Sequence, residues 1–400
     1  MNKKILTSLT AISLLCLVSI TSVFAQGHYD DKTQILHIPV VEHFSADGVL
    51  TKRYEAEMQR LPEASELTFV VKNLLELETA PISKGTILNR VRQKGQLSCG
   101  VRADSQAGFA FRDEKNRYDG FDIAFCRAVA MAVLNDPEAI NFVPLTAAER
   151  GEALQSGRVD ILSRQTTWTT TRDAQWGDFT WIMFYDGQGF MVPTNSDITK
   201  LQQLNGEKIC VTSGTTTESN LKEIFEQRGL TYTPITFSST EEAFNSYEGG
   251  KCIAITSDKS QLSALRNGFI DPDVHSILEI TVSKEPLTPV VPHGDTQWLD
   301  LVKTVLMGLI NAEELGITQA NVDEMTTSTH LEVKRFMGTR GTFGQSDLGL
   351  EANALAQVIR AVGNYGEIYD RYFGKKGLNI PRSLNRLWTE GGLIYAPPLR

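Results

Sequence analysis

The sequence is short of histidine and cysteine and has no block of basic residues. Its 400 residues include six histidines and five cysteines, and the formal net charge is −9 at pH 7. Nucleic acids and anionic membrane surfaces select clustered Lys and Arg, so this charge pattern excludes both as partners. No stretch after residue 25 is apolar for long enough to cross a bilayer, which predicts a soluble mature chain.

Common catalytic and metal-binding motifs are also missing. The chain has no Walker-type phosphate-binding loop, no GxSxG and no HExxH. No two cysteines are close together, and no histidine lies near them at ligand spacing, which argues against zinc. We therefore expect no metal, no cofactor and no catalysis.

The first 25 residues have the pattern of an export signal. MNKK is a basic start, ILTSLTAISLLCLVSI is an apolar run, and TSVFA ends in small residues suited to cleavage. This pattern predicts a secretory signal peptide cleaved after Ala25, with an uncleaved membrane anchor as the alternative. Leu15 precedes Cys16 where a lipoprotein needs a small residue, so lipidation is excluded.

Four cysteines remain after cleavage: Cys99, Cys126, Cys210 and Cys252. An even number in an oxidising compartment favours two disulfides, and four cysteines allow three pairings. Pairing nearest neighbours, Cys99 with Cys126 and Cys210 with Cys252, would place one bridge in each half of the molecule.

The chain divides into a β-rich beginning and a longer α/β part. Residues 26–83 contain three strand-like runs and predict a small antiparallel unit, in which His37 and His43 are interpreted as surface residues. From residue 84 the order strand, turn, helix recurs in two series, which predicts two α/β lobes. We expect lobe 1 at 84–193, lobe 2 at 194–283, and a return to lobe 1 with a helical C-terminal extension at 284–400.

Polar loops follow four predicted strands, at Arg102–Gln106, Ser163–Arg172, Thr212–Ser219 and Thr256–Asp258. Ligands of open α/β sheets sit at the carboxyl ends of strands. If the two lobes face one another, these four loops meet in one cleft.

The residue types in these loops suit an α-amino acid zwitterion. Arg172 offers a planar fork for a carboxylate, and Thr167 adds a hydroxyl. Thr215 and Thr216 lie at a helix start, where free N–H groups favour an anion. Asp258 can accept an ammonium group, and Trp168 can form an aromatic wall. Taken singly, each residue has an alternative: Arg172 can face water in a polar turn, the threonines can form an ordinary N-cap, Asp258 can cap a strand end, and Trp168 can be a core residue.

The chain from about residue 85 onward resembles the general L-amino acid-binding proteins of bacterial ABC transporters, within solute-binding protein family 3 and the type II periplasmic binding proteins. The runs that carry the resemblance are GFDIAFCRAVA, FVPLTAAERGEALQSGRVDILSRQTTWT, YDGQGF, CVTSGTTTE, NAEELGIT, VGNYGEIYDR and LWTEGGLIYAPPLR. The resemblance implies a periplasmic, monomeric receptor whose two lobes close on a free L-amino acid and pass it to membrane permeases. It also supports the two intralobe disulfides.

By position, the resemblance implies that Arg172 and Thr167 bind the ligand carboxylate, that Thr216 donates from lobe 2, and that Asp258 receives the α-amino group. One departure is GVRADSQAGF, where the family has a small polar residue and a Pro-Gly-Phe-like turn. It places Arg102 and Ser105 near the expected side-chain pocket. We therefore hypothesise that Arg102 biases the site toward Glu, Asp, Gln or Asn, against the alternative of a rim arginine facing solvent.

Two other functions stay open at this point. An exported enzyme on the same fold, dehydratase-like or lytic, would need a general acid or base in the cleft. The nearest carboxylates, Glu149 and Glu218, are interpreted as helix-start residues. A sensory receptor would use residues 26–83, longer than the family's usual lead, to contact a partner.

Overall fold

The computed structural model describes residues 5–6, 27–30, 35–44, 50–60, 69–77 and 85–400. The chain forms two compact units, Met1–Ser83 and Lys84–Arg400. The predicted signal peptide lies outside the described residues, apart from Ile5–Leu6. Among the helices described, none combines the length and apolar character needed to cross a membrane.

The first unit contains a five-stranded sheet in which each strand pairs antiparallel with the next. This sheet confirms the predicted antiparallel β segment. His37 and His43 both belong to β3, but their side chains lie outside the part of the chain that is described. The strands are β1 (Ile5–Leu6), β2 (Gly27–Asp30), β3 (Ile35–Phe44), β4 (Leu50–Arg60) and β5 (Phe69–Leu77).

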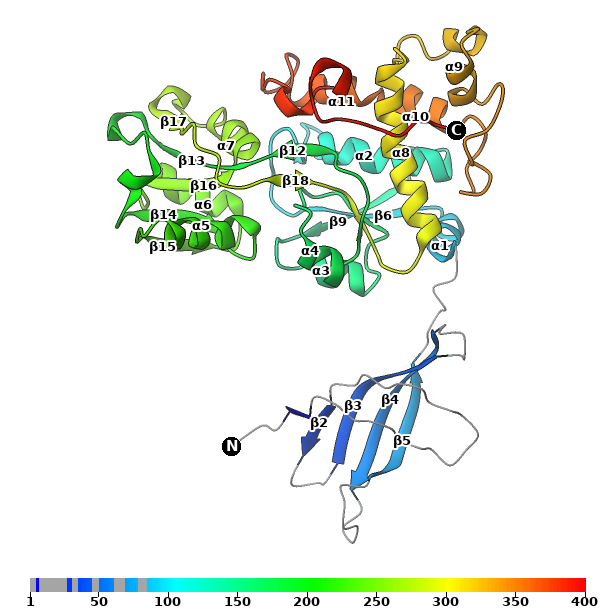
Figure 1. The fold of residues 1–400 in the computed structure, drawn as a ribbon, viewed down its shortest axis with the longest axis horizontal. Coiled ribbons are helices and arrows are strands. Elements are labelled where there is room, and N and C mark those ends of the chain that lie inside the picture. The colour runs from blue at the N-terminus through cyan, green and yellow to red at the C-terminus, as the bar shows by residue number, and fades with distance from the viewer. Residues whose placement is uncertain (1–4, 7–26, 31–34, 45–49, 61–68, 78–84) are drawn as a thin grey trace. The chain divides into compact units, whose positions relative to one another are not determined.

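Lobe 1 of the second unit is built on a sheet of order β11-β19-β10-β6-β9 (Figure 1). The central strand β6 runs parallel to β9 and β10, as expected for strands joined through helices. The strands are β6 (Leu97–Arg102), β9 (Ile140–Leu145), β10 (Ile161–Leu162), β11 (Asp178–Phe179) and β19 (Val290–Val291). The helices are α1 (Thr86–Lys94), α2 (Phe121–Leu134), α3 (Arg150–Gln155) and α4 (Thr170–Gln175), and β7 (Phe111–Arg112) pairs with β8 (Tyr118–Asp119) in a small hairpin.

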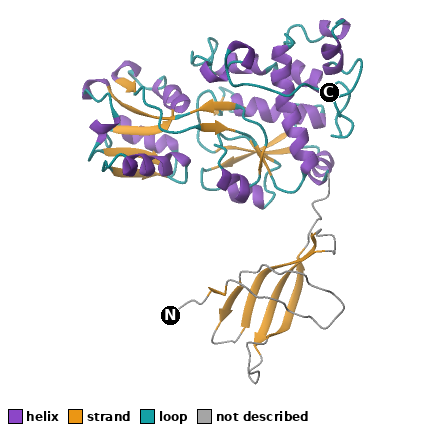
Figure 2. Ribbon diagram, viewed as in Figure 1, coloured by secondary structure: helices purple, strands orange, loops and turns teal. Residues whose placement is uncertain are grey.

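Lobe 2 has a second five-stranded sheet, of order β15-β14-β16-β13-β17, with helices beside its strands (Figure 2). Strand β14 is parallel to β15 and β16, so this lobe has the same arrangement of parallel strands joined through helices as lobe 1. The strands are β13 (Gln188–Pro193), β14 (Lys208–Thr212), β15 (Thr233–Phe237), β16 (Ala254–Asp258) and β17 (His275–Ile277). The helices are α5 (Thr216–Gln227), α6 (Thr240–Glu248) and α7 (Lys259–Arg266).

Each lobe contains one disulfide. Cys99 on β6 is bonded to Cys126 on α2, and Cys210 on β14 is bonded to Cys252 just before β16. Of the three pairings open from the sequence, the structure has the nearest-neighbour one, as the family resemblance implied.

Two crossing strands connect the lobes. The chain leaves lobe 1 through β12 (Phe184–Asp186) and returns through β18 (Glu285–Leu287). The two strands pair antiparallel, with Asp186 opposite Glu285 (Figure 1). Because only these two segments join the lobes, they form the hinge of the predicted two-lobed α/β fold.

The C-terminal extension packs on lobe 1 and holds the outgoing crossing strand. It contains α8 (Thr296–Glu314), α9 (Leu331–Phe336), α10 (Ala354–Val362) and α11 (Tyr365–Tyr372). The Asn385 side chain accepts a hydrogen bond from the Tyr185 N–H at 2.7 Å and donates one to the Tyr185 carbonyl at 3.0 Å. The extension therefore fixes β12 on the lobe 1 side of the hinge.

Candidate functional site

A polar cavity of about 40 Å³ lies between the two lobes, beside the crossing strands. Lobe 1 contributes Arg102, Ala147, Arg150, Arg164, Gln165, Thr167 and Arg172, and lobe 2 contributes Thr212, Thr215, Thr216, Thr217, Thr240, Thr256, Ser257, Asp258 and Gln261. Ligand cavities usually measure about 300 Å³ or more. A ligand must therefore enter by separation of the lobes.

All four predicted strand-end loops reach this region, and six of the eight predicted ligand-binding residues line the cavity. They are Arg102, Thr167, Arg172, Thr215, Thr216 and Asp258. Ser105 is exposed and does not line it. Trp168 also lies outside the lining, because its ring stacks on Phe179 at 5.8 Å between centroids, with 12° between the planes. The ligand contacts of these residues stay predictions.

Lobe 1 gives the cavity four buried arginines, Arg102, Arg150, Arg164 and Arg172. The Arg172 Nη1 donates to the Thr167 carbonyl at 3.0 Å, and its guanidinium lies 4.7 Å from the Trp176 ring centroid. The ring and the carbonyl fix the direction of the guanidinium, which leaves its other N–H groups for an anion. Burial lowers the pKa of Arg172, but an arginine stays charged at neutral pH.

The four arginines differ in how their charge is balanced. Arg102 forms an ion pair of 2.8 Å with Asp104 and donates to the Gln165 Oε1 at 2.8 Å. Arg150, Arg164 and Arg172 have no ion pair among the described residues, and the hydrogen bonds that they donate go to neutral oxygens. Burial and the neighbouring arginines lower the pKa of Arg150 well below its usual range, and burial together with Arg102 lowers that of Arg164 to about 9. Arg150, Arg164 and Arg172 would therefore gain more from an anionic ligand than Arg102, which already has an acidic partner.

Gln165 presents a fixed donor at the cavity wall. Its amide oxygen accepts from Arg102, which can only donate, so the amide nitrogen must point away from Arg102. This buried Nε2 has no hydrogen-bond partner in the described part of the chain. The backbone of Gln165 has a φ of +40°, a strained value for a residue with a side chain.

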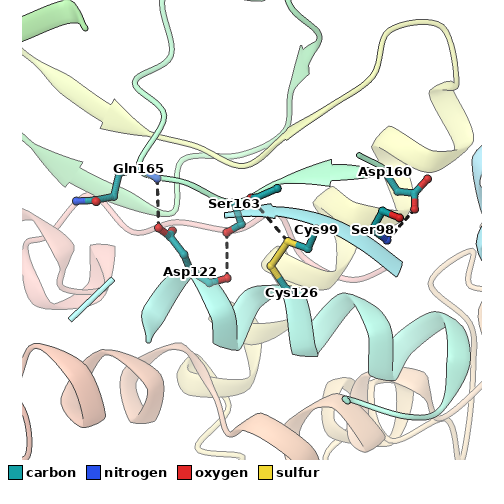
Figure 3. The surroundings of a disulfide bond; sticks show 8 residues. Ser98, Cys99, Asp122, Cys126, Asp160, Ser163 and Gln165 are labelled. Carbon is teal, nitrogen blue, oxygen red and sulfur yellow. Dashed lines mark hydrogen bonds between the residues drawn. A yellow bond between two sulfur atoms is a disulfide. The ribbon is translucent and has the colours of Figure 1, made fainter. Parts of the chain in front are cut away.

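Hydrogen bonds to α2 stabilise the strained backbone of Gln165. Its N–H donates to the Asp122 carboxylate at 3.2 Å, and the neighbouring Ser163 hydroxyl donates to the Asp122 carbonyl at 3.1 Å (Figure 3). The Cys99–Cys126 disulfide ties α2 to β6 beside these bonds (Figure 3). Burial raises the pKa of the Asp122 carboxyl to about 7.

Asp258 of lobe 2 lines the cavity, and the hinge carboxylates of Asp186 and Glu285 lie close enough to affect its charge. Asp258 ends β16, and no described group donates a hydrogen bond to its carboxylate. Burial raises its pKa well above the usual value, and the nearby charges of Asp186 and Glu285 add to this effect. Asp186 on β12 accepts from the Ser260 hydroxyl and the Gly187 N–H, and burial raises its pKa to about 6.

The start of α5 completes the lobe 2 side. The Thr215 hydroxyl caps the helix by accepting from the Glu218 N–H at 3.3 Å, and Thr216 is the first helical residue. Thr215, Thr216 and Thr217 line the cavity, so this helix start offers the type of site at which backbone N–H groups bind anions. No group of three or more His, Cys, Asp or Glu side chains in the described ranges is arranged to hold a metal ion.

This geometry places four arginines on the lobe 1 side of a small polar cavity and Asp258 on its lobe 2 side. Residues 97–375 match the family described as bacterial extracellular solute-binding proteins, family 3. The chain belongs to this family. The family-3 fold is that of the two-lobed type II periplasmic binding proteins, as the sequence predicts.

Relatives of this solute-binding protein are transport proteins. It is 47% identical over 324 residues to the general L-amino acid-binding periplasmic protein AapJ of Rhizobium johnstonii, covering 80% of this chain and 95% of AapJ. It is 42% identical over 324 residues to the glutamate/glutamine/aspartate/asparagine-binding protein BztA of Rhodobacter capsulatus, with the same coverage of 80% and 95%. A Brucella ovis periplasmic binding protein solved with glutathione bound is 45% identical, with a TM-score of 0.76, over 78% of this chain and 99% of that one.

Several cavity residues of this solute-binding protein were missed from the sequence. Arg164 and Gln165 lie inside the Ser163–Arg172 loop, so the strand-end rule could have included them. Arg150 is the first residue of α3 and follows the end of β9 at Leu145, a strand end that the sequence prediction did not include. Glu285 does not line the cavity but accepts hydrogen bonds from Thr167 and Thr216, which do, and its place on the returning crossing strand carries no local sequence signal.

Proposed function

We propose that this solute-binding protein captures free L-amino acids between its lobes and delivers them to the permease subunits of an ABC transporter. The observation that carries the proposal is the division of charge across the cavity. Arg172 lies on lobe 1 and Asp258 on lobe 2, so a zwitterion can place its carboxylate on one lobe and its ammonium on the other. Ligand contacts to both lobes favour closure.

We propose a broad range of ligands with a bias to Glu, Asp, Gln and Asn. The free donor at Gln165 Nε2 and the unpaired cations Arg150 and Arg164 suit a side chain that ends in oxygen acceptors. The names of AapJ and BztA, general L-amino acids for one and Glu, Gln, Asp and Asn for the other, support this range. Arg102 is already paired with Asp104. We therefore propose that it shapes the cavity wall but does not supply an unpaired charge to the ligand.

The protein is proposed to act without catalysis, as a periplasmic monomer after cleavage at Ala25. The two carboxylates weighed as general acids or bases do not line the cavity. Glu149 accepts from the Thr146 N–H at 2.8 Å, and Glu218 from the Gly214 N–H at 3.0 Å, so both act at helix starts. No role is proposed for residues 26–83.

Identification of the natural ligand tests this proposal. The exported protein is purified without refolding, washed and denatured, and the small molecules it releases are identified by mass spectrometry. We expect free amino acids, led by those with a side-chain carboxylate or amide, and none from the Arg172→Ala variant purified in parallel. Release of glutathione instead would make a peptide, as in the Brucella ovis relative, the ligand class. Release of neither class would contradict the proposal.

A further inference from the structure

Glu285 is a buried carboxylate at the centre of the hinge. It is the first residue of β18, is 1% exposed, and lies opposite Asp186 of the outgoing strand. No ion pair reaches it from any residue in the described ranges. A buried charge without a cation must be stabilised by hydrogen bonds.

Four side chains donate those hydrogen bonds, and they come from three parts of the molecule. The Thr167 hydroxyl of lobe 1 donates to Oε2 at 2.6 Å, and the Thr216 hydroxyl of lobe 2 donates to the same oxygen at 3.0 Å. Asn220 on α5 donates to Oε1 at 2.8 Å, and the Ser283 hydroxyl donates to Oε1 as well. One carboxylate therefore joins lobe 1, lobe 2 and the hinge.

The hydrogen bonds of this network determine which part of each threonine hydroxyl, the proton or a lone pair, is available to the cavity. An ionised carboxylate accepts hydrogen bonds only, and each hydroxyl has a single proton. Thr167 and Thr216 both give that proton to Glu285, so their hydroxyls present lone pairs toward the cavity. The ligand carboxylate is then left to Arg172 and to backbone N–H groups.

The network also depends on the distance between the lobes. Thr167 and Thr216 can share Glu285 Oε2 only while their hydroxyl oxygens lie close together, here 3.4 Å apart. Hydrogen bonds to charged groups are stronger than neutral ones, and more so away from water. Separation of the lobes must break at least one of them.

We propose that Glu285 is a positioning residue that stabilises the closed arrangement of the lobes through Thr167 and Thr216. This inference rests on the proposed function for its purpose, since a pre-closed cleft raises ligand affinity by the fraction of protein that is closed. The network itself contains no ligand atom. Its effect on closure is therefore measurable whether or not the ligand is an amino acid.

The test measures the distance between the lobes in ligand-free, full-length mature protein. Nitroxide labels are placed by non-natural amino acids, which spares the disulfides, at exposed Glu152 on α3 and exposed Glu241 on α6. Double electron–electron resonance then compares the wild type with Glu285→Gln, which keeps the shape but loses the charge. Glu279→Gln, an exposed glutamate six residues earlier, is the matched control.

We expect the wild type and Glu279→Gln to share one distance distribution that includes a closed population, and Glu285→Gln to have at most half of that closed population. Thr216→Val should open the lobes similarly, and adding it to Glu285→Gln should change little, because both remove the same contact. A purely structural role of Glu285 would instead give additive effects. Cooperative thermal unfolding of each variant shows that it is folded.

Two results would overturn the inference: a wild type that is fully open without ligand, or a Glu285→Gln distance distribution equal to that of the control. Neither depends on the ligand. If the wild type later binds no amino acid, the proposed function fails while the closure result stands.

Discussion

Thr167 and Thr216 lie with their hydroxyl oxygens 3.4 Å apart, although they are 49 residues apart in the sequence and belong to different lobes. The sequence predicts both as parts of one carboxylate site, and the structure brings them to one place. Their hydroxyl protons, however, are directed to Glu285 rather than to the cavity. Donors that remain for a ligand include the three arginines without an ion pair, Arg150, Arg164 and Arg172, and the amide nitrogen of Gln165.

Binding of an amino acid should release protons through Asp258. Burial and the charges of Asp186 and Glu285 raise the pKa of Asp258 in the free protein, so above pH 3.8 part of it remains protonated. A ligand ammonium favours the carboxylate and lowers this pKa, so a proton leaves and affinity rises with pH across the window between the two pKa values. Calorimetry at one pH in phosphate and in Tris measures the released proton. Proton uptake, or the same buffer dependence in Asp258→Asn, would contradict this role.

Arg150 should distinguish acidic from neutral ligands more than Arg102 does. Arg150 has no acidic partner in the described part of the chain, whereas Arg102 is paired with Asp104. Arg150→Met should weaken L-glutamate relative to L-glutamine by about 10- to 100-fold, the effect of one lost charged hydrogen bond. Arg102→Met should weaken both ligands alike, because it leaves Asp104 unpaired. Competitive binding of the two amino acids to each variant measures the ratio, and an equal ratio in both variants would refute the distinction.

Asp122→Asn should stabilise the protein at neutral pH. Burial raises the pKa of Asp122 from 3.8 to about 7, so the folded state keeps a proton that the unfolded state loses as pH rises between these values. Stability from this group is therefore lost with rising pH, by an amount on the order of a few kcal/mol at pH 8. The asparagine oxygen can still accept from the Gln165 N–H. Urea unfolding at pH 4 and pH 8 measures the free energy of unfolding. We expect Asp122→Asn to raise this free energy strongly at pH 8 and only slightly at pH 4. An equal decrease at both pH values would contradict the prediction.

The sequence was a good guide to elements and a poorer one to side-chain surroundings. Alternating strands and helices predicted two α/β lobes, because hydrophobic periodicity is a local property. The strand-end rule located Arg172 and Asp258 at one cavity for the same reason. It could not show that Trp168 packs on Phe179, since a ring beside a cleft and a ring in a core have the same local pattern.

Residues that act across long sequence distances were beyond the local patterns. Arg150 comes from a helix and Glu285 from a crossing strand, and each acquires its neighbours only when the lobes assemble. The partner of Arg102 is Asp104, two residues away, yet the sequence alone did not indicate that Arg102 would be buried with this partner beside it. The four arginines differ in whether an acidic side chain pairs with them in the folded state. This difference depends on tertiary packing.

The central claim is that the cavity between the lobes binds free L-amino acids through Arg172. The direct measurement is calorimetric titration of the mature, disulfide-intact protein with a panel of L-amino acids, after unfolding and refolding to remove bound ligand. The account predicts heat with several members, strongest for Glu, Asp, Gln and Asn, and loss of at least 100-fold in affinity in Arg172→Ala. No heat from any member, with protein shown to be folded, would contradict it, as would an Arg172→Ala variant that binds like the wild type.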